Sequence, residues 1–359
     1  MVNQLIKRIF SPLWHRIANR LAIRLQPMIE KRLVEENALL RGALDSGGSH
    51  REEKERLDHL GRPGNEQLIQ PWIFIPPIVK TENEGHSRFM AYSTCAVADF
   101  LHPEYRKLCQ LIAGQPIFHR KQWEWIYIVH HLLDNGVLKE NAKGLGFGVG
   151  TEPLPALFAS LGCDITATDA PSDVGVAKGW QKTAQHSSNV ESLRYEGIID
   201  RETLLKHIKH GVCDMNAIDP GYSGFDFCWS SCCFEHLGSL EAGAEFVINS
   251  VEQTLKPGGV ACHTTELNLS SNDETVSVGD TVLYRQRDIE ELVRRLEARG
   301  HQVGAFCIAP DSHYLDGVVD VPPYRHNPHL KLLLSGYVTT SVGIVIKRGA
   351  VDNGGESGV

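Results

Sequence analysis

The spacing of apolar and polar residues divides the chain into five parts. The first places apolar and basic residues at helical spacing, which predicts a basic amphipathic helix. A stretch rich in charge and glycine follows and is typical of a solvated linker. Apolar, proline-punctuated sequence then predicts a helical cap, after which strand-like and helix-like stretches alternate. We assign the helix to residues 1–44, the linker to 45–66, the cap region to 67–140, an α/β domain to 141–348 and a flexible tail to 349–359.

Strands and helices alternate through the α/β domain. Apolar stretches such as DITATD and FDFCWSS predict strands, and PLPALFASLG predicts a helix. Strands that alternate with helices imply a parallel sheet with right-handed crossovers. We expect strands near residues 143–147, 164–169, just before Asp214, and near 225–231, 260–267, 302–309 and 336–348, with helices within 153–162, 239–255 and 287–300.

The N-terminal helix is predicted over residues 5–33, and its partner stays open. Residues 1–34 hold seven lysines and arginines against Glu30 alone, so the acidic excess of the chain lies elsewhere. A basic amphipathic helix suits a coiled-coil or other protein partner, a peripheral membrane anchor, or packing on its own domain. A homo-oligomer is one form that the protein partner would take.

Composition narrows the function classes. The chain has 359 residues, 42% of them hydrophobic and 22% charged, which is typical of a globular protein. Its net charge of −8 argues against a nucleic-acid partner. We find no apolar run of about 18 residues that would span a bilayer, and no cleavage site of a secretory signal. The nine cysteines lack C-x-x-C spacing, so we predict a reduced, cytoplasmic protein, with membrane association through residues 5–33 left open.

A glycine-rich loop is the strongest sign of a ligand. Gly146, Gly148 and Gly150 alternate between a predicted strand and a helix, where absent side chains let a ligand approach the backbone. A tight strand-to-helix turn would explain the same glycines. Asp169 ends the next strand, where nucleotide-binding α/β folds bind ribose hydroxyls. The G-x-G-x-G spacing differs from the G-x-G-x-x-G of dinucleotide sites, which disfavours a nicotinamide oxidoreductase.

With these motifs in this order, the chain resembles the class I, Rossmann-like S-adenosylmethionine-dependent methyltransferases over roughly residues 120–348. The resemblance implies a mostly parallel seven-stranded sheet with helices on both faces, and S-adenosylmethionine as cofactor. By position, it assigns cofactor contacts to Gly146, Gly148, Gly150, Asp169, the adenine-flanking Asp214 and Met215, and Ser230 in the fourth-strand motif. The family usually has an acid where this chain has Gly144, so we take Glu152 as the candidate that supports the methionine amino group.

Catalysis would need mainly alignment, because the sulfonium already carries a good leaving group. A hydroxyl or amine acceptor must also lose a proton, which calls for a base that titrates near neutral pH. His236 follows the fourth predicted strand and is our candidate base, although it would equally cap the next helix. Glu235 is placed to orient its ring, and Glu266 lies near the carboxyl end of the fifth strand. We predict no metal site, because the spaced histidine pairs lack a clear third ligand.

The sequence thus predicts a methyltransferase whose acceptor is a small molecule or a glycan. Segments such as HRKQWEW and WSSCCFEHLGSLEAG resemble bacterial methyltransferases of polysaccharide-synthesis settings, which implies O-methylation of a sugar or glycan intermediate. The loop over residues 320–326 is a candidate acceptor wall. An alternative is a non-catalytic adaptor that keeps the α/β scaffold and is recruited through its N-terminal helix, and Gly144 in place of an acid motivates it.

Overall fold

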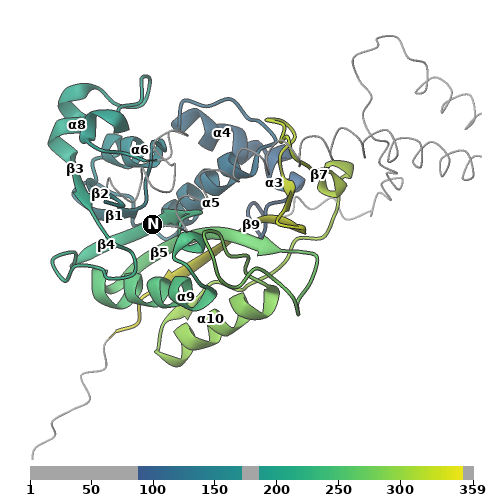
Figure 1. The fold of residues 1–359 in the computed structure, drawn as a ribbon. Helices are drawn as coiled ribbons and strands as arrows, with labels where there is room; N and C mark the ends of the chain where they lie inside the picture. Colours follow the sequence, from purple (N-terminus) through teal and green to yellow (C-terminus); the bar gives the residue numbers. More distant parts are fainter. Residues whose placement is uncertain (1–87, 172–185, 351–359) are drawn as a thin grey trace, which may run out of the picture. The chain divides into compact units, whose positions relative to one another are not determined.

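The computed structural model describes residues 88–171 and 186–350 (Figure 1). The predicted helix over 1–44, the linker over 45–66, the first part of the cap region and residues 351–359 of the tail lie outside the described residues. The boundaries drawn between these parts therefore stay predictions.

A mixed sheet of nine strands forms the centre of the described chain, in the order β3-β2-β1-β4-β5-β9-β8-β7, with β6 also paired to β9. The first five strands of this order run parallel, and β9 runs antiparallel along β5. This order fits the Rossmann-like α/β architecture that the sequence implies. The strands are β1 (Lys143–Phe147), β2 (Asp164–Asp169), β3 (Ile208–Val212), β4 (Phe225–Ser231), β5 (Leu255–Asn268), β6 (Gln302–Val303), β7 (Val319–Asp320), β8 (Lys331–Leu334) and β9 (Tyr337–Lys347).

The expectation of seven, mostly parallel strands is wrong at one edge of the sheet. The proline-rich loop predicted over residues 320–326 begins in a short strand, β7, which pairs with a second short strand that follows the loop, β8. β8 and β6 then pair with different parts of the outer edge of β9, both antiparallel. An unpaired strand edge exposes backbone donors and acceptors, and these short strands cover that edge.

Helices cover both faces of the sheet, as expected (Figure 1). Phe227 and Trp229 of β4 pack with Trp123 and Phe158 on one face, whereas Cys228 packs with Phe246 on the other. This alternation follows the two-residue period of a strand. The first face carries α5 (Arg120–Asp134), α6 (Leu154–Ser160) and α8 (Arg201–His207), after the short α3 (Val97–Leu101) and α4 (Pro103–Leu111); the second carries α9 (Leu240–Asn249) and α10 (Gln286–Ala298).

The start of α5 is held at the sheet by specific contacts. The His119 side chain accepts a hydrogen bond from the amide of Lys121 and caps the helix. Trp123 is fully buried, and its Nε1 donates to Oδ2 of Asp99 at 2.8 Å. Because Trp123 is anchored in this way, the first turn of α5 meets the carboxyl ends of β4 and β5.

Two further observations concern disulfide bonds and membrane-spanning helices. All nine cysteines are free thiols, as their spacing suggested. Within residues 88–171 and 186–350, we find no helix that is both long enough and apolar enough to cross a bilayer.

Candidate active site

The two glycines within β1 are required by packing. A Cβ at Gly144 would lie 2.3 Å from Cζ of Phe227, and one at Gly146 would lie 2.5 Å from Cζ2 of Trp229. These aromatic residues are the register partners of the glycines on β4. The missing acid at position 144 therefore has a structural cause, because the space for its side chain is filled by Phe227 and Ile165.

The next two glycines form a bare loop at the carboxyl end of β1. Gly148 and Gly150 have φ angles of +57° and +51°, in the left-handed region that favours glycine. A Cβ at Gly148 would lie 2.8 Å from Sγ of Cys233 and 3.8 Å from Sδ of Met215. The loop therefore meets the segments that follow β3 and β4.

Asp169 ties this loop to the end of β2. Its Oδ2 accepts hydrogen bonds from the amide of Gly150 at 3.0 Å and from the amide and hydroxyl of Ser187 at 2.9 and 3.2 Å. Its Oδ1 accepts from the amide of Ala170 at 2.8 Å. The carboxylate is buried, so a ribose hydroxyl would have to take the place of Ser187 to reach it.

The other predicted cofactor residues differ in accessibility. Asp214 is exposed, and its Oδ1 accepts from the amide of Asn216, while Met215 is half-buried beside Gly148. Ser230 is fully buried, and its Oγ lies 2.8 Å from Nδ1 of His263, whose Nε2 lies 3.0 Å from Oγ of Ser250. Burial lowers the pKa of His263 to about 3, so its ring is neutral and structural. A cofactor contact through Ser230 would require breaking this bond.

Glu152 is a buried carboxyl group just after the glycine loop. Its Oε1 accepts a hydrogen bond from Nε1 of Trp229 at 2.7 Å. Burial raises the pKa of Glu152 to about 8, although the Trp229 hydrogen bond opposes this shift. The group is therefore mostly protonated at neutral pH, and a nearby ligand ammonium would favour its ionised form. This chemistry fits the amino group of a methionine moiety.

The first turns of α5 place three charged residues, Arg120, Lys121 and Glu124, at the same edge of the sheet. Glu124 is fully buried and accepts from Arg120, Lys121, Ser231 and Ser341. Burial alone would raise the pKa of Glu124, but the charges of Lys121 and Arg120 lower it to about 2. Lys121 also donates to the carbonyl and hydroxyl of Ser231, at 3.0 and 3.3 Å, and so fixes the end of β4.

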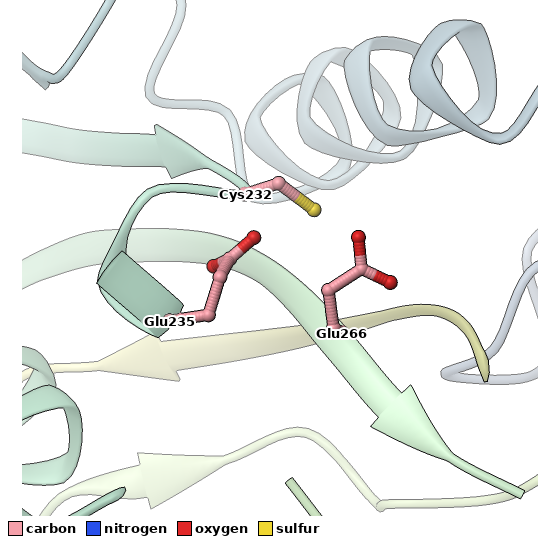
Figure 2. Close-up of side chains that lie close together, drawn as sticks. All are labelled: Cys232, Glu235 and Glu266. Atoms are coloured by element: carbon pink, nitrogen blue, oxygen red, sulfur yellow. The ribbon is translucent and has the colours of Figure 1, made fainter. Parts of the chain in front are cut away.

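Cys232 and Glu235, which follow β4, converge with Glu266 near the carboxyl end of β5 (Figure 2). One ligand-type atom from each lies within 4.8 Å of the other two. Cys232 has a φ of +50°, and its amide donates to the carbonyl of Thr264. Glu235 accepts from Oγ1 of Thr265 at 2.9 Å. The thiol of the adjoining Cys233 donates to the carbonyl of Gly148 at 3.2 Å, which joins this corner to the glycine loop.

Glu266 is the buried acid of this corner that titrates near neutrality. Its Oε1 pairs with Nη2 of Arg120, whereas none of the described residues offers its buried Oε2 a hydrogen bond. Burial raises the pKa of Glu266 to about 7, the Arg120 charge opposes the shift, and the Glu235 charge adds to it. Such a carboxylate is suited to accept a proton at neutral pH.

His236 lies in the short helical turn Phe234–His236, next to this corner. Its Nδ1 lies 2.8 Å from the carbonyl of Asp280 and 3.2 Å from Oγ1 of Thr281. A proton on Nδ1 would be donated to that carbonyl, which would make Nε2 the basic nitrogen of the ring. The site thus has two groups able to act as base, His236 and Glu266.

Within the part of the chain that the structure describes, Cys232, Glu235 and Glu266 are the one group with the side chains and spacing of a metal site. Arg120 already places positive charge there, through its pair with Glu266 and with Nη1 at 3.8 Å from the Cys232 sulfur. A cation would compete with this guanidinium. The histidine pairs are engaged elsewhere, since His207 lies 3.0 Å from Asp164 and His329 lies 2.6 Å from Asp320.

The predicted acceptor wall meets the start of α5, because the ring centroids of His119 and His326 lie 5.2 Å apart. Asp320 accepts from the amide of Arg325, which stiffens the loop, while Tyr324 stays exposed and its hydroxyl donates to the carbonyl of Leu333. Burial raises the pKa of Tyr324, and the charge of Glu266 adds to the rise. Arg120 and Glu124 were not assigned to the site from sequence. Their signal was a run of charged residues on an otherwise apolar helix.

Comparisons with known proteins give weak structural matches. Neither a protein-family model nor a curated protein matches the chain. A 1,6-didemethyltoxoflavin-N1-methyltransferase from Burkholderia thailandensis, solved with S-adenosylhomocysteine, is 14% identical, with 65% of this chain and 80% of that chain covered and a TM-score of 0.36. A magnesium protoporphyrin IX methyltransferase from Synechocystis, also solved with S-adenosylhomocysteine, is 13% identical, with 70% and 98% covered and a TM-score of 0.36. Matches at this level do not bear on activity or substrate.

Proposed function

We propose that the chain is an S-adenosylmethionine-dependent methyltransferase that acts on an oxygen acceptor. The observation that carries the proposal is the bare left-handed loop at Gly148 and Gly150, bonded through the Gly150 amide to Asp169 at the end of β2. Open α/β sheets bind ligands at the carboxyl ends of their strands, and this loop lies there. A buried proton acceptor, Glu266, adjoins the same edge.

Three residues of the chain would each contact a different part of the cofactor. Asp169 is the group for the ribose hydroxyls, Met215 lies beside the loop on the adenine side, and Glu152 is the buried acid for the amino group. The cofactor would supply a methyl group on a sulfonium, whose thioether is a good leaving group. The protein then needs to hold the acceptor in line and remove its proton.

We assign the proton-accepting role to Glu266, with His236 as the second candidate. A general base works best when its pKa lies near the operating pH, and the pKa of Glu266 is raised to about 7. The contact between Nδ1 of His236 and the carbonyl of Asp280 supports the second candidate, because it would leave Nε2 basic. The pH profile argued in the Discussion separates the two.

A sugar or glycan is our proposed acceptor class. The support is the resemblance of the sequence to bacterial methyltransferases of polysaccharide-synthesis settings, together with an acceptor corner rich in carboxylates that can accept hydroxyl donors. Mass spectrometry tests this class directly. Extracted glycan intermediates should gain one methyl group when the protein and S-adenosylmethionine are added, as a methyl ether rather than a methylamine.

Calorimetry tests the cofactor without knowledge of the acceptor. S-adenosylmethionine and S-adenosylhomocysteine should bind the full chain with measurable heat, whereas a reduced nicotinamide cofactor should not. Asp169→Asn should weaken binding about tenfold or more, equivalent to about 1.4 kcal/mol. Asp164→Asn, at the exposed start of the same strand, is the matched control. No heat with folded wild-type protein would reject the proposal.

The adaptor alternative loses the observation that motivated it. Position 144 lacks an acid because Phe227 fills the space, so the glycine there is no sign of lost catalysis. Cofactor binding without turnover on any glycan extract would favour the adaptor.

A further inference from the structure

In one buried ion pair, each partner has a polar atom that makes no hydrogen bond to the described residues. Nη2 of Arg120 pairs with Oε1 of Glu266, yet Nε of Arg120 and Oε2 of Glu266 are both buried and find no hydrogen-bond partner among the described residues. A buried donor or acceptor that makes no hydrogen bond destabilises the folded protein. The neighbouring Lys121 and Glu124, by contrast, have several partners each. Among these four charged residues, the unmet bonding capacity therefore lies on Arg120 and Glu266.

These atoms face the proposed acceptor corner. Glu266 extends from β5 toward Cys232 and Glu235 in Figure 2. The Arg120 side chain keeps 16% of its surface exposed, so the pair borders solvent rather than lying sealed in the core.

The chemistry of the two orphaned atoms selects one kind of ligand group. An ammonium can only donate, so it would satisfy Oε2 of Glu266 and repel Arg120. A carboxylate can only accept, so it would satisfy Nε of Arg120 and repel Glu266. A hydroxyl donates one hydrogen and accepts through its lone pairs, and it satisfies both atoms.

We propose that an alcohol hydroxyl of the acceptor binds between Arg120 and Glu266, donating to Oε2 of Glu266 and accepting from Nε of Arg120. This inference rests on the proposed function and adds Arg120 as a catalytic residue that touches the reacting oxygen. It also selects a hydroxyl over an ammonium or a carboxylate group at this position.

The transfer balances with these groups. The hydroxyl O–H bond breaks, and its proton passes to Oε2 of Glu266. The oxygen forms a bond to the methyl carbon while the carbon–sulfur bond breaks, and its electron pair returns to sulfur. The products are a methyl ether and a neutral thioether, and Glu266 releases its proton to solvent. The Arg120 cation stabilises the negative charge that grows on the oxygen.

Crystals of the full chain soaked in ethylene glycol test the geometry without turnover. We expect a glycol oxygen within hydrogen-bonding distance of both Nε of Arg120 and Oε2 of Glu266. Parallel soaks in ethylammonium chloride and sodium acetate should leave that position free of either ion. A direct bond from Nε to Oε2 that excludes glycol, or an ethylammonium or acetate ion bound there instead, would overturn the proposal.

Variants separate this site from the overall fold. Arg120→Lys keeps a cation beside Glu266 but lacks a second donor at the Nε position, so the glycol oxygen should be lost. Glu266→Gln, which keeps the side-chain shape, should also lose it and serves if the first variant does not fold. Arg285→Lys alters an arginine that pairs with Asp288 and should keep the glycol. Glycol retained in both site variants would refute the inference, whereas calorimetry of the cofactor tests the methyltransferase proposal separately.

Discussion

At the scale of single residues, burial raises the pKa of all three acids of the site, and only at Glu124 do neighbouring cations reverse the shift. Glu124 stays ionised because two cations surround it, whereas Glu152 and Glu266 are held close to neutrality by burial. In our proposal, the same residue type therefore serves as a structural anion, a partner of a cationic ligand group and a proton acceptor. Sequence analysis identified Glu152 and Glu266 from their positions after β1 and on β5. It took His236 rather than Glu266 as the base, because the burial and charge partners that raise the pKa of Glu266 come from the folded chain.

The rate of methyl transfer should depend on the ionisation of Glu266. The base works when deprotonated, so the rate should rise with pH through about 7 and level off above it. Glu266→Gln should lower the rate by about 10²–10⁴-fold and abolish this pH dependence. Initial rates of S-adenosylhomocysteine formation with an extract of unmethylated glycan intermediates measure both effects. If Glu266→Gln keeps the pH profile and His236→Gln removes it, His236 is the base.

Glu152 should lower the stability of the folded protein at neutral pH and strengthen the binding of the cofactor. Its pKa rises from an ordinary 4.5 to about 8 in the folded chain, so between these pH values the native state holds more protons than the unfolded state. Stability contributed at this site therefore falls as pH rises across that window. Glu152→Gln removes the effect and keeps an acceptor for Trp229, so it should stabilise the protein at pH 7 by at most about 3 kcal/mol.

The same variant should weaken S-adenosylmethionine binding, because the ammonium loses its anionic partner. Thermal unfolding at several pH values and calorimetry of the cofactor measure the two effects. Glu140→Gln, an exposed acid elsewhere, is the control and should change neither. A variant that is no more stable at pH 7 than the wild type would contradict the raised pKa.

At the scale of elements, the hydrophobic pattern predicted β1, β2, β4, β5 and β9 and the helices α6, α9 and α10. It failed where the pattern was short or proline-rich, at β7 and β8, whose pairing depends on the open edge of β9. Of the strand expected near 302–309, only Gln302 and Val303 pair with β9. The placement of Arg120 and Glu124 also escaped prediction, because it depends on contacts more than 100 residues distant in the chain.

The close approach of β1 to β4 should make the Gly144 position intolerant of a side chain. A Cβ there would lie 2.3 Å from Phe227, so Gly144→Ala should destabilise the fold by about 1–3 kcal/mol. Gly317→Ala meets nothing within 4 Å and is the matched control. The double variant Gly144→Ala with Phe227→Leu should recover part of the loss. Chemical denaturation of the variants measures these differences, and an unchanged midpoint for Gly144→Ala would count against the packing account.

The anchoring of α5 to β4 should depend on Glu124. Glu124→Gln removes a buried anion from Arg120 and Lys121, and breaking a buried pair in this way costs about 3–5 kcal/mol. Glu104→Gln breaks the exposed pair with Lys107 and should cost less than about 1 kcal/mol. Because the folded pKa of Glu124 is lowered to about 2, its contribution is present above about 4.5 and is lost as pH falls toward 2. Denaturant titrations at pH 7 and pH 3 should therefore show a smaller gap between wild type and Glu124→Gln at the lower pH.

At the scale of the whole molecule, two groups of buried residues cover the two faces of the sheet, and the candidate site lies where the parallel strands end between them. The order of strand, glycine turn and acid could be predicted from the sequence, because each of these motifs is a short continuous segment. The acceptor corner combines α5, β4, β5 and the segment before β8, which no local pattern brings together. The three interpretations of residues 5–33 stay predictions, since this segment lies outside the described residues.

Deleting residues 1–44 should leave cofactor binding intact, because the proposed cofactor residues all lie between Gly146 and Ser230. The basic charge of residues 1–34 lies apart from the acidic remainder of the chain, so its removal should change association rather than catalysis. Light scattering after size-exclusion chromatography and sedimentation with vesicles of phosphatidylserine and phosphatidylcholine distinguish a protein partner from a membrane. A smaller oligomer with unchanged vesicle binding indicates self-association, and lost vesicle binding that salt also weakens indicates an anionic membrane. If the shortened chain instead loses its cooperative thermal transition, residues 1–44 pack on the α/β domain, and the third interpretation is correct.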